Sequence, residues 1–97
     1  MVRLYVLTYE VVDGYVERRQ AWRETHLALA RKWAARGQLL LGGALDDPVD
    51  RALLVFRVED ASTIELFVRD DPYVQNGLVR AWSIRSWNAV VGAALPG

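Results

Sequence analysis

The chain begins with a segment whose apolar residues lie on both sides of an extended backbone. Residues 2–9 are rich in Val, Leu, Tyr and Thr, and neither alternating set is polar. This pattern predicts a β-strand that must be covered on both faces. Asp13-Gly14 then interrupts the pattern with residues typical of a turn or a helix cap.

The hydrophobic period becomes helical between residues 15 and 36. Apolar and aromatic side chains recur there at steps of four, three and four, which places them on one stripe of a helix. The stripe consists of Trp22, His26, Leu29 and Trp33, with Tyr15, Arg19 and Ala30 beside it. Arg23 and most other charged residues are expected on the remaining faces. Gly37 is a typical helix stop, so one continuous helix of roughly 30 Å is predicted.

Four further elements are predicted after this helix. They are strands over residues 38–45, 51–58 and 78–87, and a second helix over residues 62–69. The order βαββαβ predicts a single ferredoxin-like α+β domain over residues 1–97, with a four-stranded antiparallel sheet and both helices on one face. The other sheet face is apolar and has no segment left to cover it. We therefore expect a homodimer, or a higher homo-oligomer, that forms through this open face.

The amino-acid composition excludes or disfavours several classes of binding partner and of metal site. Twelve basic and twelve acidic residues give a formal net charge of zero, which disfavours binding to nucleic acid. The chain has no cysteine, so disulfides and thiolate metal sites are excluded. The apolar runs are shorter than the ~20 residues of a membrane span, and no signal peptide is evident. These features predict a cytoplasmic protein that does not bind membranes.

His26 is the single histidine of the chain, and two interpretations of it are open. An imidazole on a helix stripe can serve as a general acid or base, oriented by a neighbouring carboxylate such as Asp71. Alternatively, His26 is a hydrogen-bonded core residue, and Asp71 before Pro72 is the N-cap of a short helix. If Asp71 has both roles, we expect one carboxylate oxygen to cap the helix and the other to face the ring.

Several residues on the first and last strands are candidates for substrate binding, and both strands are expected to be central in the sheet. They are Tyr5, Thr8, Ser83, Arg85 and Trp87, with Tyr9 as a further candidate for the pocket wall. Arg85 is suited to binding an anionic substrate, although a salt bridge to an acidic neighbour is an alternative. Gly42-Gly43 lacks the surrounding pattern of a phosphate loop, and no metal-ligand motif is present. No cofactor is therefore expected.

Taken together, several segments resemble the YciI-like (YCII-related) family. They are LYVLTY at 4–9, THL at 25–27, GQLLLGGAL at 37–45, ALLVF at 52–56, DPYV at 71–74, GL at 77–78 and IRSW at 84–87. The resemblance implies a ferredoxin-like fold, dimers, and an active site formed by His26 and Asp71. It also implies cofactor-free acid–base chemistry on a small organic substrate, aromatic or lactone-like. The chain departs from the family pattern at two places. The segment after Gly43 is less rich in Gly and Pro, and residues 21–24 lack a proline.

Three functions are compatible with these features. The first is a cofactor-free enzyme in which His26 transfers a proton and Asp71 orients it, for isomerisation, elimination or lactone chemistry. The second is a non-catalytic subunit that binds a small ligand. The third is a cofactor-independent monooxygenase acting on quinol-like substrates, as in the neighbouring group of dimeric α+β barrels.

Overall fold

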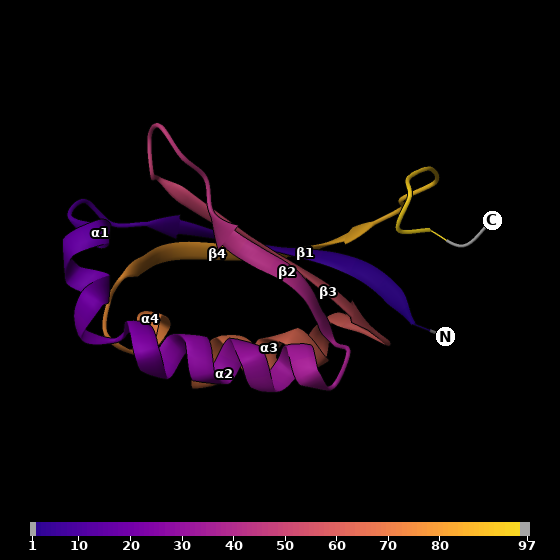
Figure 1. Cartoon of the computed structure of the whole chain (residues 1–97), viewed down its shortest axis with the longest axis horizontal. Coiled ribbons are helices and arrows are strands. Elements are labelled where there is room, and N and C mark those ends of the chain that lie inside the picture. The colour runs from indigo at the N-terminus through magenta and orange to yellow at the C-terminus, as the bar shows by residue number, and fades with distance from the viewer. Residues whose placement is uncertain (1, 96–97) are drawn as a thin grey trace.

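A computed structural model describes residues 2–95 and contains one four-stranded antiparallel sheet (Figure 1). The strands are β1 (Arg3–Val11), β2 (Leu39–Ala44), β3 (Arg51–Val58) and β4 (Val79–Trp87). The helices are α1 (Tyr15–Arg18), the 3₁₀ turn η1 (Arg19–Ala21), α2 (Arg23–Ala35), α3 (Ala61–Asp70) and α4 (Pro72–Gln75). The spatial order β2-β3-β1-β4 confirms the ferredoxin-like topology predicted from the sequence.

The hydrophobic core lies between the sheet and the two longer helices, which Figure 1 shows on the same side of the sheet. The strands supply alternate residues to it, because successive side chains of a strand point to opposite faces. In the centre, Phe67 of α3 makes edge-to-face contacts with Phe56 of β3 and Trp33 of α2, with ring centroids 5.2 and 5.5 Å apart. This aromatic cluster fixes both helices against the sheet.

The sheet face opposite the helices remains partly accessible in the single chain. Register places Thr8 opposite Ser83 and opposite Leu53 on this face, and Val6 opposite Val55 and Arg85. Thr8, Val6, Leu53 and Val55 are half-buried, whereas the alternate residues of β1 and β3 are buried beneath the helices. The expectation of an open, largely apolar face is therefore met by the described residues.

Two details of the sequence interpretation are wrong. The predicted continuous helix over residues 15–36 is interrupted, because Trp22 leaves the helical region with φ −119° and ψ 1°. The helical period restarts at Arg23, so the residues before Trp22 are not on the face that one continuous helix would give them. In addition, β4 is an edge strand and not a central one, since only β1 pairs with it. No helix within residues 2–95 is long and apolar enough to cross a membrane.

Replacing Phe67 should test the central role of the aromatic cluster. Phe67→Ala removes a fully buried ring and should lower the free energy of unfolding by about 3–5 kcal/mol in urea titrations. Leu66→Ala is a matched control on the same helix, because Leu66 is exposed, and it should change that energy by less than about 0.5 kcal/mol. Equal effects of the two substitutions would contradict this packing.

Candidate active site

The site is built around Asp71, which lies in the junction between α3 and α4. Its backbone is extended, with φ −74° and ψ 118°, as expected for a residue that precedes a proline. Pro72 occupies the first turn of α4, where its missing N–H costs nothing. This junction turns the Asp71 side chain inward, and Asp71 is fully buried. A buried carboxylate is costly unless polar groups surround it, so its hydrogen bonds determine whether this arrangement is stable.

Three groups form hydrogen bonds with the Asp71 carboxylate. The Tyr73 backbone N–H donates to Oδ1 over 2.9 Å, and His26 Nδ1 lies 2.8 Å from the same oxygen. The Tyr9 hydroxyl donates to Oδ2 over 2.8 Å. Asp71 is thus both a helix cap and the partner of His26. The expected division of these roles between its two oxygens is wrong, because Oδ1 serves both and Oδ2 accepts from Tyr9.

The carboxylate fixes the protonation pattern of the His26 ring. A carboxylate only accepts hydrogen bonds, so Nδ1 must carry the proton when it is 2.8 Å from Asp71 Oδ1. In the neutral ring this leaves Nε2 as an acceptor, which is the form a general base requires. The Tyr73 ring stacks on the imidazole, with ring centroids 3.8 Å apart and an interplanar angle of 8°. This stacking restrains the plane of the His26 ring.

Tyr9 acts as a permanent donor in this network. Burial, and next the negative charge of Asp71, raise the pKa of the Tyr9 hydroxyl well above its usual range. The phenol therefore keeps its proton at any physiological pH and continues to donate to Asp71. Tyr9 lies on the helix-facing side of β1, so the central strand of the sheet anchors the carboxylate from below.

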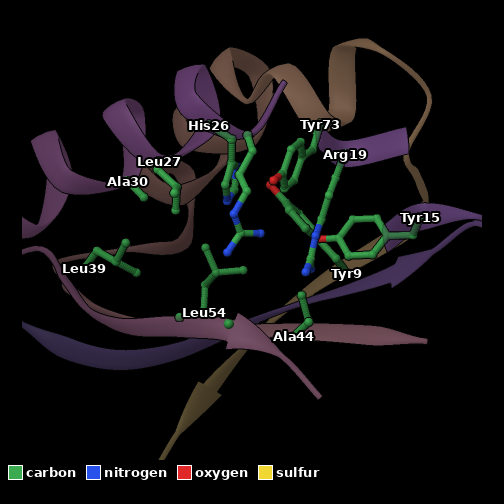
Figure 2. A pocket seen from close by; sticks show the side chains of 14 residues that line it. Tyr9, Tyr15, Arg19, His26, Leu27, Ala30, Leu39, Ala44, Leu54 and Tyr73 are labelled. Atoms are coloured by element: carbon green, nitrogen blue, oxygen red, sulfur yellow. The ribbon is translucent and has the colours of Figure 1, made fainter. Parts of the chain in front are cut away.

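His26 faces a pocket of about 170 Å³ between α2 and the sheet (Figure 2). Its aromatic residues are Tyr9, Tyr15 and Tyr73, and its basic residues are Arg19, Arg23 and His26. The remaining lining residues are small or aliphatic, namely Leu27, Ala30, Leu39, Gly42, Gly43, Ala44, Ala52 and Leu54. In Figure 2, His26 points from α2 toward the sheet, with Leu54 on the opposite side. The arrangement suits a compact ligand with a polar edge and an apolar body.

The structure brings His26 and Asp71 together, whereas the predicted substrate-binding residues lie elsewhere. Thr8, Ser83, Arg85 and Trp87 are on the open sheet face or its edge, because each pairs in register with a residue of that face. Tyr5 is buried under the helices but does not line the His26 pocket. Their role in substrate binding stays a prediction. No carboxylate among residues 2–95 forms an ion pair with Arg85, so its alternative salt bridge is not seen.

Sequence reasoning did not assign a role to Tyr73, Arg19 or Arg23. Tyr73 directly follows the Asp71-Pro72 pair in the sequence. This proximity to Asp71 was the available signal that Tyr73 lies at the site. Arg23 was expected on another face, but it precedes His26 by three residues within α2, and this spacing places both side chains at the pocket. Among residues 2–95, no group of three or more His, Cys, Asp or Glu side chains is placed to hold a metal ion.

Comparison with known proteins places the chain in a structural context. The sequence profile of the YCII-related domain matches residues 3–88. A search of curated proteins gives no match. A solved structure with a similar fold is 5-chloro-2-hydroxyhydroquinone dehydrochlorinase (TftG) from Burkholderia phenoliruptrix AC1100, in complex with 2,5-dihydroxybenzoquinone. It is 22% identical, with a TM-score of 0.74, and the match covers 88% of this chain and 93% of that chain.

Replacing Tyr9 by Phe should reveal its link to Asp71 at alkaline pH. A tyrosine in the unfolded chain loses its proton above a pH of about 10, while folded Tyr9 keeps it because its pKa is raised. Tyr9 therefore contributes stability that is complete below that pH and is lost as pH rises, at about 1.4 kcal/mol per pH unit. In Tyr9→Phe, this part of the alkaline decline should be absent.

The same variant should also lose stability at neutral pH. Removing the hydroxyl leaves Asp71 Oδ2 without its donor, which should cost about 1–3 kcal/mol of unfolding free energy. Urea titrations of the parent and of Tyr9→Phe, at neutral pH and at several alkaline values, measure both effects. Parallel pH dependences of the two proteins would show that Tyr9 does not retain its proton in the folded state.

Proposed function

Since this chain belongs to the YCII-related family, we propose that it is a cofactor-free enzyme that performs acid–base chemistry with His26 on a small organic substrate. The observation that carries the proposal is the 2.8 Å contact between His26 Nδ1 and the fully buried Asp71 carboxylate, at the wall of a pocket. Asp71 holds the ring in one tautomer and stabilises the imidazolium that forms when Nε2 takes a proton.

The proposed proton transfer requires no oxidant or reductant. A C–H or O–H bond of the substrate breaks, the proton moves to His26 Nε2, and the electron pair remains on the substrate. In an isomerisation the proton returns to another substrate atom, and in an elimination the electron pair expels a leaving group as an anion. The related structure supports this class of reaction, because its name describes the removal of a chloride substituent from an aromatic ring.

The size of the pocket supports a substrate with a single ring. A cavity of about 150 Å³ is large enough for benzene, and the pocket here measures about 170 Å³. Tyr15 and Tyr73 provide aromatic walls, and their rings meet edge to face with centroids 5.7 Å apart. Substituted hydroquinones and unsaturated lactones are therefore the first compounds to assay.

Substitution of His26 and Asp71 should separate chemistry from binding. On any substrate of this class, His26→Gln should lower kcat by about 10²–10⁴-fold, the usual contribution of a general base. Asp71→Asn should lower kcat as well, because an amide no longer fixes the Nδ1–H tautomer. Asp70→Asn is the matched control, since Asp70 is exposed and contacts Arg69 instead of His26.

The assay follows ultraviolet absorbance and halide release, and nitrogen NMR of His26 gives the tautomer in each variant. Binding of the compounds without turnover by the parent protein would favour the non-catalytic ligand-binding subunit. Oxygen consumption during turnover would favour the monooxygenase instead. An Asp71→Asn variant with changed tautomer and full activity would refute the role proposed for the His–Asp pair.

We further propose that the active form is a homodimer joined through the open sheet face. This face combines the half-buried residues Val6, Thr8, Leu53 and Val55 with the exposed side chain of Trp87, and together with Arg85 and Ser86 they surround a shallow hollow. Apolar area of this kind is normally covered by a partner, and a second copy of the chain presents a complementary surface by symmetry.

A charge at the centre of this face should dissociate the dimer. We expect the parent protein to sediment at twice the 11.0 kDa mass of the chain, and Val6→Glu at the mass of one chain. Leu66→Glu is the control, because it introduces the same charge on the outer side of α3 and should leave the dimer intact. A parent protein that sediments as a single chain would exclude this interface.

A further inference from the structure

The His26 pocket carries an unbalanced charge. Its lining residues include two arginines and the histidine, but no aspartate or glutamate. The Asp71 carboxylate does not offset them from the pocket side, because it is fully buried behind the ring that it orients. An anionic group is the complement that this lining lacks.

The two guanidinium groups are available to a ligand. Among residues 2–95, no carboxylate forms an ion pair with Arg19 or Arg23. The Arg19 guanidinium lies over the Tyr15 ring, 5.1 Å from its centroid, and this contact holds it at the pocket wall. Figure 2 shows the side chains of Arg19 and Tyr15 reaching together into the space between the helical segment and the sheet.

Tyr73 offers a further donor at the same place. Its hydroxyl is buried and donates no hydrogen bond within the described part of the chain, although the residue lines the pocket. Burial, and next Tyr15, raise the pKa of the Tyr73 hydroxyl, whereas the charges of Arg23 and Arg19 and a hydrogen bond from the Arg23 guanidinium act in the opposite direction. A buried hydroxyl whose hydrogen is not donated is uncommon in native structures, and an acceptor atom of a ligand would satisfy it.

The opposite wall of the pocket is apolar. Leu39, Leu54, Ala44 and Ala52 line it, and Gly42 lies where an added Cβ would meet Leu54 Cγ at 3.1 Å. This wall has no charged side chain, so the polar and apolar sides of the pocket are segregated. A planar ring would rest on the aliphatic side with its substituents turned toward the arginines and Tyr73.

We propose that the pocket is specific for a planar, single-ring anion whose negatively charged oxygen is bound by Arg19, Arg23 and the Tyr73 hydroxyl. This inference deepens the proposed function and rests on the same pocket. The arginines hold the anionic oxygen at one edge of the ring while His26 Nε2 faces another part of the substrate. When His26 removes a proton, the electron pair remains on the substrate and is delocalised over the conjugated ring, and the two nearby cations stabilise the added negative charge.

Binding measurements test the proposal without requiring turnover. Calorimetric titration compares 2,5-dihydroxybenzoate with its neutral analogue 2,5-dihydroxybenzamide. In the parent protein the benzoate should bind about tenfold or more tightly than the amide. Arg19→Gln and Arg23→Gln should each weaken binding of the benzoate by about tenfold and leave binding of the amide unchanged. Tyr73→Phe should produce a smaller loss, again confined to the anion.

A second pair of compounds distinguishes the source of the charge. 4-Nitrophenol is compared with nitrobenzene at a mildly alkaline pH, where 4-nitrophenol is ionised. If only the phenolate binds more tightly than its neutral analogue, the negatively charged oxygen that the arginines bind is a ring oxygen and not a carboxylate oxygen. Arg31→Gln is the control for a lost charge, because Arg31 is an exposed residue of α2 outside the pocket. It should leave all affinities unchanged.

Equal affinity for anionic and neutral members of both pairs would overturn the proposal, as would arginine variants that bind the anions normally. Failure of all four compounds to bind would overturn it as well. These outcomes are independent of the His26 chemistry, because they depend on dissociation constants alone. A protein that binds anions as expected, but whose His26→Gln variant retains full turnover, would refute the proposed function and keep the specificity.

Discussion

The buried Asp71 carboxylate is the constraint on which the rest of the site depends. A charge that is removed from water must be surrounded by donors, and here a backbone N–H, a tyrosine and the histidine provide them. These donors come from the start of α4, from β1 and from α2. The three elements must therefore be assembled in one geometry before the carboxylate is satisfied. Folding and orientation of the His26 imidazole are consequences of the same set of hydrogen bonds.

The fold was largely predictable because binary patterning determines it. The apolar runs of β1 and β3 and the helical stripe ending at Trp33 specify which elements pack together, whatever the details of the loops. From the residues alone, the pairing of His26 with Asp71 was one of two open interpretations, and the family resemblance favoured it. The two residues are 45 positions apart, and local spacing does not report a contact between elements that the tertiary fold brings together.

The pocket was less predictable, and the break at Trp22 illustrates the reason. No glycine or proline marks the break at Trp22, so periodicity alone extended one helix across residues 15–36. An error of this kind changes the face on which every preceding or following residue is expected. The prediction that β4 is a central strand was wrong for a related reason. Strand order is a tertiary property and does not follow from the character of a single strand.

The break at Trp22 also divides the pocket into two parts with different tolerance to change. His26 and Arg23 belong to α2, whose packing against the core is fixed by Trp33, whereas Tyr15 and Arg19 belong to the short segment before the break. That segment is joined to α2 by a residue outside the helix, so its sequence and length can vary without rotating the imidazole away from Asp71. Sequence changes within residues 15–21 would then alter which ligands the pocket accepts while the His26–Asp71 pair keeps its geometry, much as exchangeable loops do on larger protein scaffolds.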